Sequence, residues 1–162
     1  MPLKEAYERL GGIQKKQYKT GIYNLATLII PAGFAPLFGG QMPEILLSAA
    51  MGALLALIIT VGKRWNVNGF ILDTVSSFMV AAAVFLLGAK ISGVDLDIVI
   101  ISAIMPLVPG VAITNAVRDI LQGDYMSGNA RVLEAFLTAA GIAIGAGAGM
   151  WIAGVIIAGG VR

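Results

Sequence analysis

Five long apolar segments dominate the chain and restrict what it can fold into. A helix needs roughly 20 apolar residues to cross the hydrocarbon core of a bilayer, and each segment reaches or nearly reaches that length. We therefore expect an all-α, polytopic integral membrane protein with about five transmembrane helices. The segments cover about residues 22–38, 43–61, 70–87, 98–121 and 132–159.

The composition supports a lipid-facing surface. Hydrophobic residues make up 58% of the chain and charged residues 12%, with a mean hydropathy of +0.89. Soluble proteins carry about 25% charged residues. A soluble domain of 162 residues could not bury this much apolar surface, because small domains bury only about two-thirds of theirs.

The first 20 residues are the polar part of the chain. Leu3, Tyr7 and Leu10 recur at helical spacing, and Gly11-Gly12 interrupts the pattern. We expect two parts: an amphipathic cytoplasmic leader helix in residues 1–20, and a five-span transmembrane domain in residues 21–162.

Basic residues indicate the orientation. Lys and Arg collect in short cytoplasmic loops. They cluster before the first segment and recur after the second, at Lys63 and Arg64, and after the fourth, at Arg118 and Arg131. This alternation predicts that the amino terminus lies inside, and an odd number of spans puts the carboxyl terminus outside.

Missing residue types exclude several classes of protein. The chain has no Cys and no His, so it has no disulfide framework, no thiolate metal site and no Cys–His nucleophile pair. We expect no enzyme, no metal and no cofactor. The pI near 9.0 does not indicate a nucleic-acid partner, because the basic residues lie beside apolar runs.

The fourth segment contains two prolines and a glycine within five residues, at Pro106, Pro109 and Gly110. Each proline removes a backbone donor and clashes with the carbonyl four residues earlier. The freed backbone groups must be packed in protein or line a wet cavity, and transporters often place such broken helices at their substrate sites. The alternative is a simple proline kink.

Polar residues follow this break, at Thr114, Asn115, Arg118 and Asp119. Ionisable groups at membrane depth are expensive and usually line pathways or pair with each other. We expect Asn115 to make a polar contact with substrate. Arg118 and Asp119 could instead lie at the cytoplasmic mouth, where they need no special role.

Two further carboxylates fall in the same half of the membrane. Asp73 lies a turn inside the third segment and is a candidate proton carrier or counter-ion for Arg118; the alternative is an interfacial carboxylate. Glu134 lies in the expected first turn of the fifth segment, where the helix dipole favours a carboxylate without any functional role. Together with the residues after the break, they suggest a vestibule that faces the cytoplasm.

The fifth segment carries Gly141, Gly145 and Gly149 at four-residue spacing. Small residues in register let helices approach closely. We expect a helix-packing face here, which could also bind a partner chain.

The fourth segment and its surroundings resemble the threonine/serine exporter family. The resemblance covers roughly residues 5–155 and rests on the following strings: Leu37-Phe38-Gly39-Gly40, Met105-Pro106-Leu107-Val108-Pro109-Gly110, Thr114-Asn115-Ala116-Val117-Arg118-Asp119, Gly123-Asp124, Ser127-Gly128, Ala130-Arg131 and Glu134-Ala135.

The resemblance implies an inner-membrane secondary exporter of small hydrophilic metabolites such as threonine and serine. Some relatives export dicarboxylates such as succinate, and coupling to the proton gradient is implied as well. Family members usually have a sizeable cytoplasmic domain before their spans, and also a second membrane half. This chain therefore looks like half of a transporter, a trimmed chain, or a compact relative that oligomerises.

The leading hypothesis is thus an exporter subunit for amino acids or small carboxylates. It would work in the lipid bilayer with a second membrane half, which is either a separate subunit or another copy of this chain. One rival hypothesis is a non-transporting assembly or scaffold protein that binds a partner through the glycine face. The other is a passive channel.

Overall fold

The computed structural model describes residues 20–88, 91 and 93–159, and these contain helices and no strands. Of the leader helix expected in residues 1–20, residues 1–19 lie outside the described part, and Thr20 is the first residue of α2. The helices are α2 (Thr20–Leu37), α3 (Met42–Arg64), α4 (Gly69–Gly88), α5 (Leu96–Ile104), α6 (Gly110–Leu121) and α7 (Tyr125–Gly159), with the 3₁₀ turn η1 (Met105–Leu107) between α5 and α6.

Polar residues set the starts of several helices. Asp95 accepts the N–H groups of Asp97 and Ile98 with its side chain and so caps α5. Asn68 accepts the N–H of Phe70 at 2.9 Å at the start of α4. These side chains satisfy donors that the first turn of a helix leaves unpaired.

Left-handed residues follow three of the helices, α2 (at Gly39, φ 86°), α3 and α6. Asn66 (φ 52°) follows α3, and Gly123 (φ 87°) follows α6. After α6, the N–H of Asp124 bonds to the carbonyl of Asp119 and that of Gly123 to Ile120, both at 3.0 Å. This is the Schellman pattern, which turns the chain sharply after a helix.

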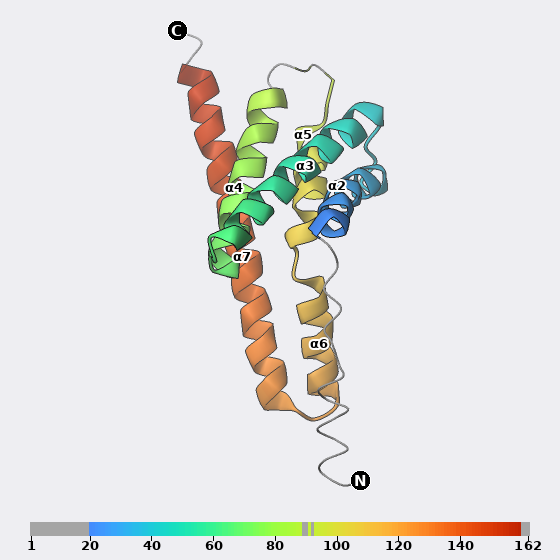
Figure 1. The fold of residues 1–162 in the computed structure, drawn as a ribbon, viewed down its shortest axis with the longest axis vertical. Coiled ribbons are helices and arrows are strands. Elements are labelled where there is room, and N and C mark those ends of the chain that lie inside the picture. Colours follow the sequence, from blue (N-terminus) through green and yellow to red (C-terminus); the bar gives the residue numbers. More distant parts are fainter. Residues whose placement is uncertain (1–19, 89–90, 92, 160–162) are drawn as a thin grey trace.

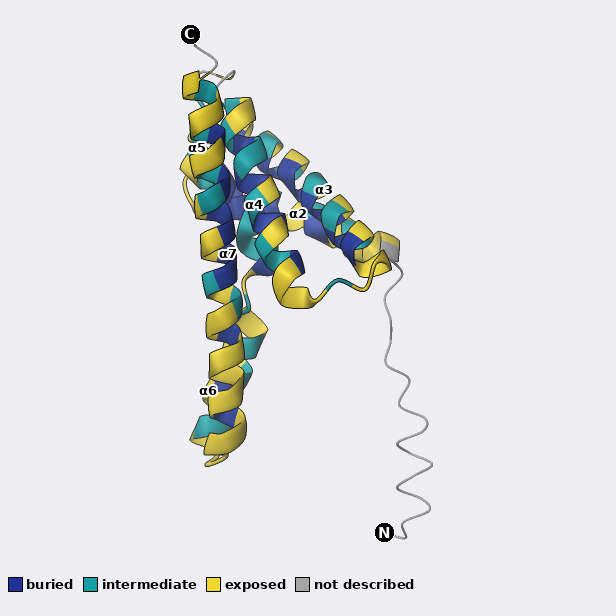
Figure 2. Cartoon of the chain, turned by 90° about the vertical axis from the view of Figure 1, so that its left-hand side faces the viewer, coloured by how far each residue is buried: buried dark blue, intermediate teal, exposed yellow. Residues whose placement is uncertain are grey.

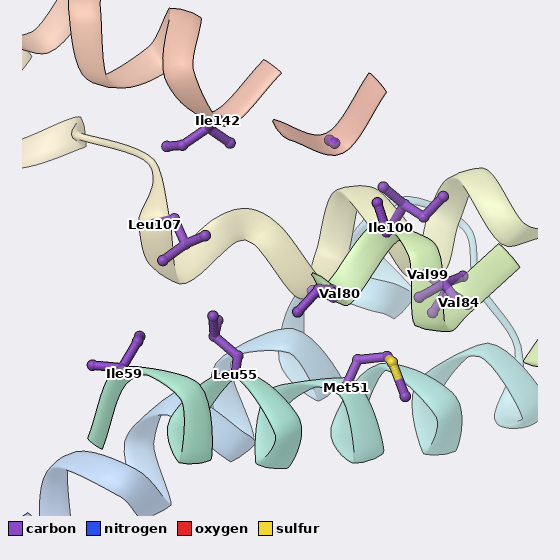
Figure 3. Packing of buried hydrophobic residues seen from close by; sticks show 12 residues of the cluster. Met51, Leu55, Ile59, Val80, Val84, Val99, Ile100, Leu107 and Ile142 are labelled. Atoms are coloured by element: carbon purple, nitrogen blue, oxygen red, sulfur yellow. The ribbon is translucent and has the colours of Figure 1, made fainter. Parts of the chain in front are cut away.

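The core lies where α3, α4, α5 and α7 meet. Leu55, Val80, Val84 and Val99 are completely buried within one apolar cluster. Figure 3 shows Leu107 of η1 between Ile142 of α7 and the α3 residues Leu55 and Ile59. The broken part of the chain is therefore tied into the core.

Three helices are long and apolar enough to cross a membrane, namely α3, α4 and α7, and the bent pair α5–α6 would make a fourth span. The apolar stretch Gly21–Leu37 of α2 is shorter, and α2 contains Pro31 and Pro36. A helix of 17 residues is about 25 Å long, somewhat less than the hydrocarbon core of about 30 Å. The protein is thus a multi-pass helical protein suited to a bilayer, and the fifth span remains a prediction that depends on α2.

The last helix begins earlier than the sequence pattern predicts. α7 starts at Tyr125 and not near Val132, because Asp124 caps it by accepting the N–H of Ser127 at 3.2 Å. The expected loop with Arg118 and Arg131 shrinks to a short turn. Glu134 lies at the tenth residue of α7, so its placement in the first helical turn was wrong, and the helix dipole does not account for it.

With this early start, α6 and the first half of α7 form a helical hairpin that extends beyond the other helices (Figure 1). Figure 2 shows that most of its surface is exposed. The exposed side chains include large apolar ones, such as Val111, Leu121, Met126 and Phe136.

Candidate transport site around the broken helix

The predicted break is a two-step interruption of the helix. α5 ends at Ile104, and η1, which follows it, contains Pro106. α6 then begins at Gly110, and its axis is bent by 57° from that of the segment Leu96–Leu107. The N–H of Val108 bonds to the carbonyl of Met105 at 3.2 Å, and the N–H of Gly110 bonds to that of Val108 at 2.8 Å. Short-range bonds of this kind replace those that the prolines cannot make.

One side of the break is covered by protein and the other is open. Leu107 is buried against the core, whereas Val108 is 44% exposed. No side chain caps the start of α6. The first N–H groups of a helix have no intrahelical partner, so α6 offers free donors at the break.

Of the polar side chains that follow the break, some bond within the chain and others are accessible to a ligand. The Thr114 hydroxyl donates to the carbonyls of Gly110 (3.1 Å) and Val111 (3.0 Å), along its own helix. Asp119 forms an ion pair with Arg131 of α7, with 3.1 Å between Oδ2 and Nε. Asn115 is partly exposed and Arg118 is exposed on α6, so these two remain available to a ligand.

Asp73 lies near the break in depth but apart from Arg118. Asp73 precedes Thr74, whose hydroxyl would be 2.6 Å from a Cβ at Gly141 of α7. The residue after Gly141, Ile142, belongs to the apolar cluster that contains Leu107. Arg118 comes eight residues after Gly110, about 12 Å further along α6. The two residues form no ion pair with each other.

Glu134 lines a pocket of about 490 Å³ between the start of α4 and the middle of α7. Asn68, Phe70 and Thr138 line it as well, and Glu134 is the one charged residue among the described residues of its lining. The Thr138 hydroxyl donates to the Glu134 carbonyl at 3.0 Å, which leaves the Glu134 carboxylate for other partners. A carboxylate beside an aromatic ring suits a cationic group.

The three glycines of α7 face α4. A Cβ at Gly141 would meet Phe70 and Thr74, one at Gly145 would meet Thr74 and Ser77, and one at Gly149 would meet the backbone of Phe78 and Ala82. Glycines further along α7 meet residues further along α4, so the two helices run parallel. The close approach leaves no room for a side chain at these positions.

Two polar residues of note were absent from the sequence-based candidates. Asn68 was not considered, although Asn followed by Gly and an apolar run is a common helix start. Glu44 is 5% exposed and accepts backbone N–H groups from Gln41 (2.8 Å) and Asp95 (3.1 Å). An acidic residue three positions after a cap residue is the signal that could have identified Glu44.

These features define a class: a multi-pass helical membrane protein with a proline-broken helix packed into its core. The sequence of residues 1–153 matches the family model ThrE, described as "Putative threonine/serine exporter". The match covers most of the chain, so the chain belongs to this family, as its motifs suggested. No curated protein and no solved structure matches it.

Proposed function

We propose that this chain is a subunit of a secondary transporter that exports small hydrophilic metabolites across the inner (plasma) membrane. The observation that carries the proposal is the broken helix α5–η1–α6 in a chain of the exporter family. Broken helices in transporters direct free backbone groups at substrate near the middle of the membrane. The break in this chain is anchored by Leu107 and open at Val108, as such a site requires.

Within this proposal, substrate binds beside the start of α6. The free backbone donors after Pro109 and the side chain of Asn115 hold it, and Arg118 attracts a carboxylate group. Asp73, at the depth of the break, carries the proton that couples export to the gradient.

The pocket at Glu134 favours amino acids over dicarboxylates as the exported class. Its one charged residue is a carboxylate, which attracts the ammonium group of threonine or serine and repels succinate. The pocket lies between the exposed tip of the α6–α7 hairpin and Asp73, so it would hold substrate on its way from the cytoplasm to the break.

A second membrane half completes the transporter in this proposal. The exposed apolar side chains of α6 and α7 support it, because the hairpin packs on one side only. That half is a separate subunit or a second copy of this chain. Five spans with the amino terminus inside would let an inverted second half form a pseudo-symmetric pair.

The test is efflux from proteoliposomes that contain this chain, alone and together with the product of the neighbouring gene. Threonine, serine and succinate are loaded inside with a proton gradient imposed. We expect gradient-driven efflux of the amino acids that falls at least tenfold in Asn115→Ala and Asp73→Asn. Asn129→Ala and Asp97→Asn are matched controls, since both residues are exposed and lie away from the break.

Other outcomes would point to the rival hypotheses. Efflux that is insensitive to proton uncouplers would indicate a passive channel. A membrane assembly role predicts that Asn115→Ala and Asp73→Asn leave all function intact; Gly145→Leu does not distinguish the hypotheses, because the glycine face packs on α4. Absence of gradient-driven efflux in both preparations would count against an exporter.

A further inference from the structure

A groove of about 400 Å³ runs along the outer side of α3 and α4, apart from the break and the Glu134 pocket. All its lining residues within the described ranges are apolar. Its walls are two stripes at four-residue spacing: Leu57, Val61 and Trp65 on the α3 side, and Ile71, Val75 and Met79 on α4. Residues at this spacing share one face of a helix.

The groove is open to its surroundings and has a formed floor. The six wall residues are 42–78% exposed. At the floor, the missing side chain of Gly62 makes room for Leu72, whose methyl group occupies the place of a Cβ. The groove therefore depends on the absence of a side chain at Gly62, and its floor is part of the contact between α3 and α4.

The length of the groove fits one leaflet of a bilayer. The first and last residues of each wall are eight positions apart, or about 12 Å along the helix. Half of a hydrocarbon core of about 30 Å is about 15 Å. A single extended acyl chain thus matches the groove in length and in its apolar lining.

Positive charge lies at the loop end of the groove. Arg64 is exposed and lies seven residues after Leu57, on the same face of α3. Trp65 beside it is 78% exposed, as expected for an anchor at the membrane surface. Lys63 points elsewhere, since its Nζ lies 4.0 Å from the ring centre of Tyr23.

Among the residues that the structure describes, no carboxylate opposes this charge on the groove side. Asp73 follows Ile71 by two residues, which places it on the opposite side of α4 from the groove wall. Arg pairs with phosphate through two parallel hydrogen bonds and is well suited to lipid headgroups.

We propose that the α3–α4 groove binds one anionic phospholipid, with an acyl chain along the groove and the phosphate at Arg64. The lipid belongs to the leaflet on the side of the α3–α4 loop. This assignment is independent of the exported substrate and needs only that α3 and α4 span the membrane.

Native mass spectrometry of the full chain, released from detergent with added phosphatidylglycerol or phosphatidylcholine, tests the proposal. We expect one phosphatidylglycerol to be retained about tenfold better than phosphatidylcholine. Arg64→Gln should remove this preference, and Val75→Trp should fill the groove and reduce retention of both lipids. Size-exclusion profiles and thermal unfolding establish that each variant is folded.

Two matched variants serve as controls. Arg131→Gln removes the same charge from α7, and Val155→Trp adds the same bulk at an exposed position of that helix. Both should retain phosphatidylglycerol as the parent chain does. The proposal fails if Arg64→Gln keeps the preference, or if Val75→Trp retains as much lipid as Val155→Trp.

A protein occupant would be detected separately. The chain has no Cys, so Val75→Cys introduces a unique thiol into the groove. Efficient cross-linking of this thiol to a second copy or to another subunit in native membranes would show that a protein covers the groove and would overturn the lipid assignment. A thiol that stays free of protein cross-links while lipid is retained supports it.

Discussion

The Glu44 carboxylate accepts the backbone N–H of Asp95 across 3.1 Å and so ties the first turn of α3 to the residue that caps α5. Its other oxygen accepts the N–H of Gln41 at 2.8 Å. The broken helix therefore begins at a fixed point beside α3. The contact with Glu44 holds the start of α5, and the packing of Leu107 in the core holds the broken segment at its other end.

Replacing Glu44 should destabilise the protein through backbone groups that lose their acceptor. Glu44→Ala leaves both N–H groups without a partner, whereas the amide oxygen of Glu44→Gln can still accept one of them. We expect the unfolding temperature to fall in the order parent, Gln, Ala, as measured by the thermal unfolding of detergent-solubilised protein. Asp97→Ala is the control, because that exposed side chain caps nothing. Equal unfolding temperatures for Glu44→Ala and Asp97→Ala would contradict the anchor.

The contact between α4 and α7 should not tolerate a side chain at Gly145. A Cβ there would collide with the Thr74 carbonyl and the Ser77 hydroxyl, and the backbone cannot move aside without separating the helices. We expect Gly145→Leu to cost about 1–3 kcal/mol of unfolding free energy, as overpacking does. Gly147→Leu is a close control, because nothing lies within 4 Å of a Cβ at that position. If the two variants unfold alike, the helices do not pack through this face.

The ion pair between Asp119 and Arg131 should contribute little to stability. The side chain of Arg131 is 50% exposed, and solvent screens such a pair. A double-mutant cycle with Asp119→Asn and Arg131→Gln should give a coupling below about 1 kcal/mol that declines as salt is added. A large, salt-independent coupling would mean that the hairpin is buried against a partner.

The start of α7 should loosen in acid. The hydrogen bonds from Ser127 to Asp124 hold the pKa of the Asp124 carboxyl below its ordinary value of 3.8. Because the folded-state pKa is the lower one, the stabilisation is complete above the ordinary value and is lost as the pH falls through the folded-state value. Hydrogen-exchange protection of the Ser127 and Gly128 amides should decrease over that window. The side chain of Asp124→Asn can still cap α7 but does not titrate. In this variant, the hydrogen-exchange protection that the cap provides should not change with pH.

Glu134 should set substrate charge preference. If its carboxylate receives an ammonium group, Glu134→Gln reduces efflux of threonine and serine relative to succinate by about tenfold, the size expected for losing one charged hydrogen bond. The readout is competition between the two substrates in the same proteoliposomes. Gln122→Ala, in the exposed turn after α6, is a control for general effects on the hairpin. An unchanged ratio would remove Glu134 from the pathway and leave the break as the substrate site.

Local chemistry made much of this fold predictable. The apolar runs locate the helices because burial in lipid requires length and hydrophobicity, which any window of the sequence displays. Pro106, Pro109 and Gly110 predict the break because each proline lacks a donor wherever it lies. The start of α7 was placed too late because the polar residues before Val132 look like a loop, although Asp124 caps a helix there.

Which side chains meet was decided by the tertiary structure. Helical periodicity assigns residues to faces, but the crossing of helices and the turns between them determine which faces touch. Thus Asp119 pairs with Arg131 because Gly123 reverses the chain, and Asp73 forms no ion pair with Arg118. Glu44 reaches Asp95 across 51 positions of sequence, a contact that no local pattern encodes because it exists only once α3 and α5 begin side by side.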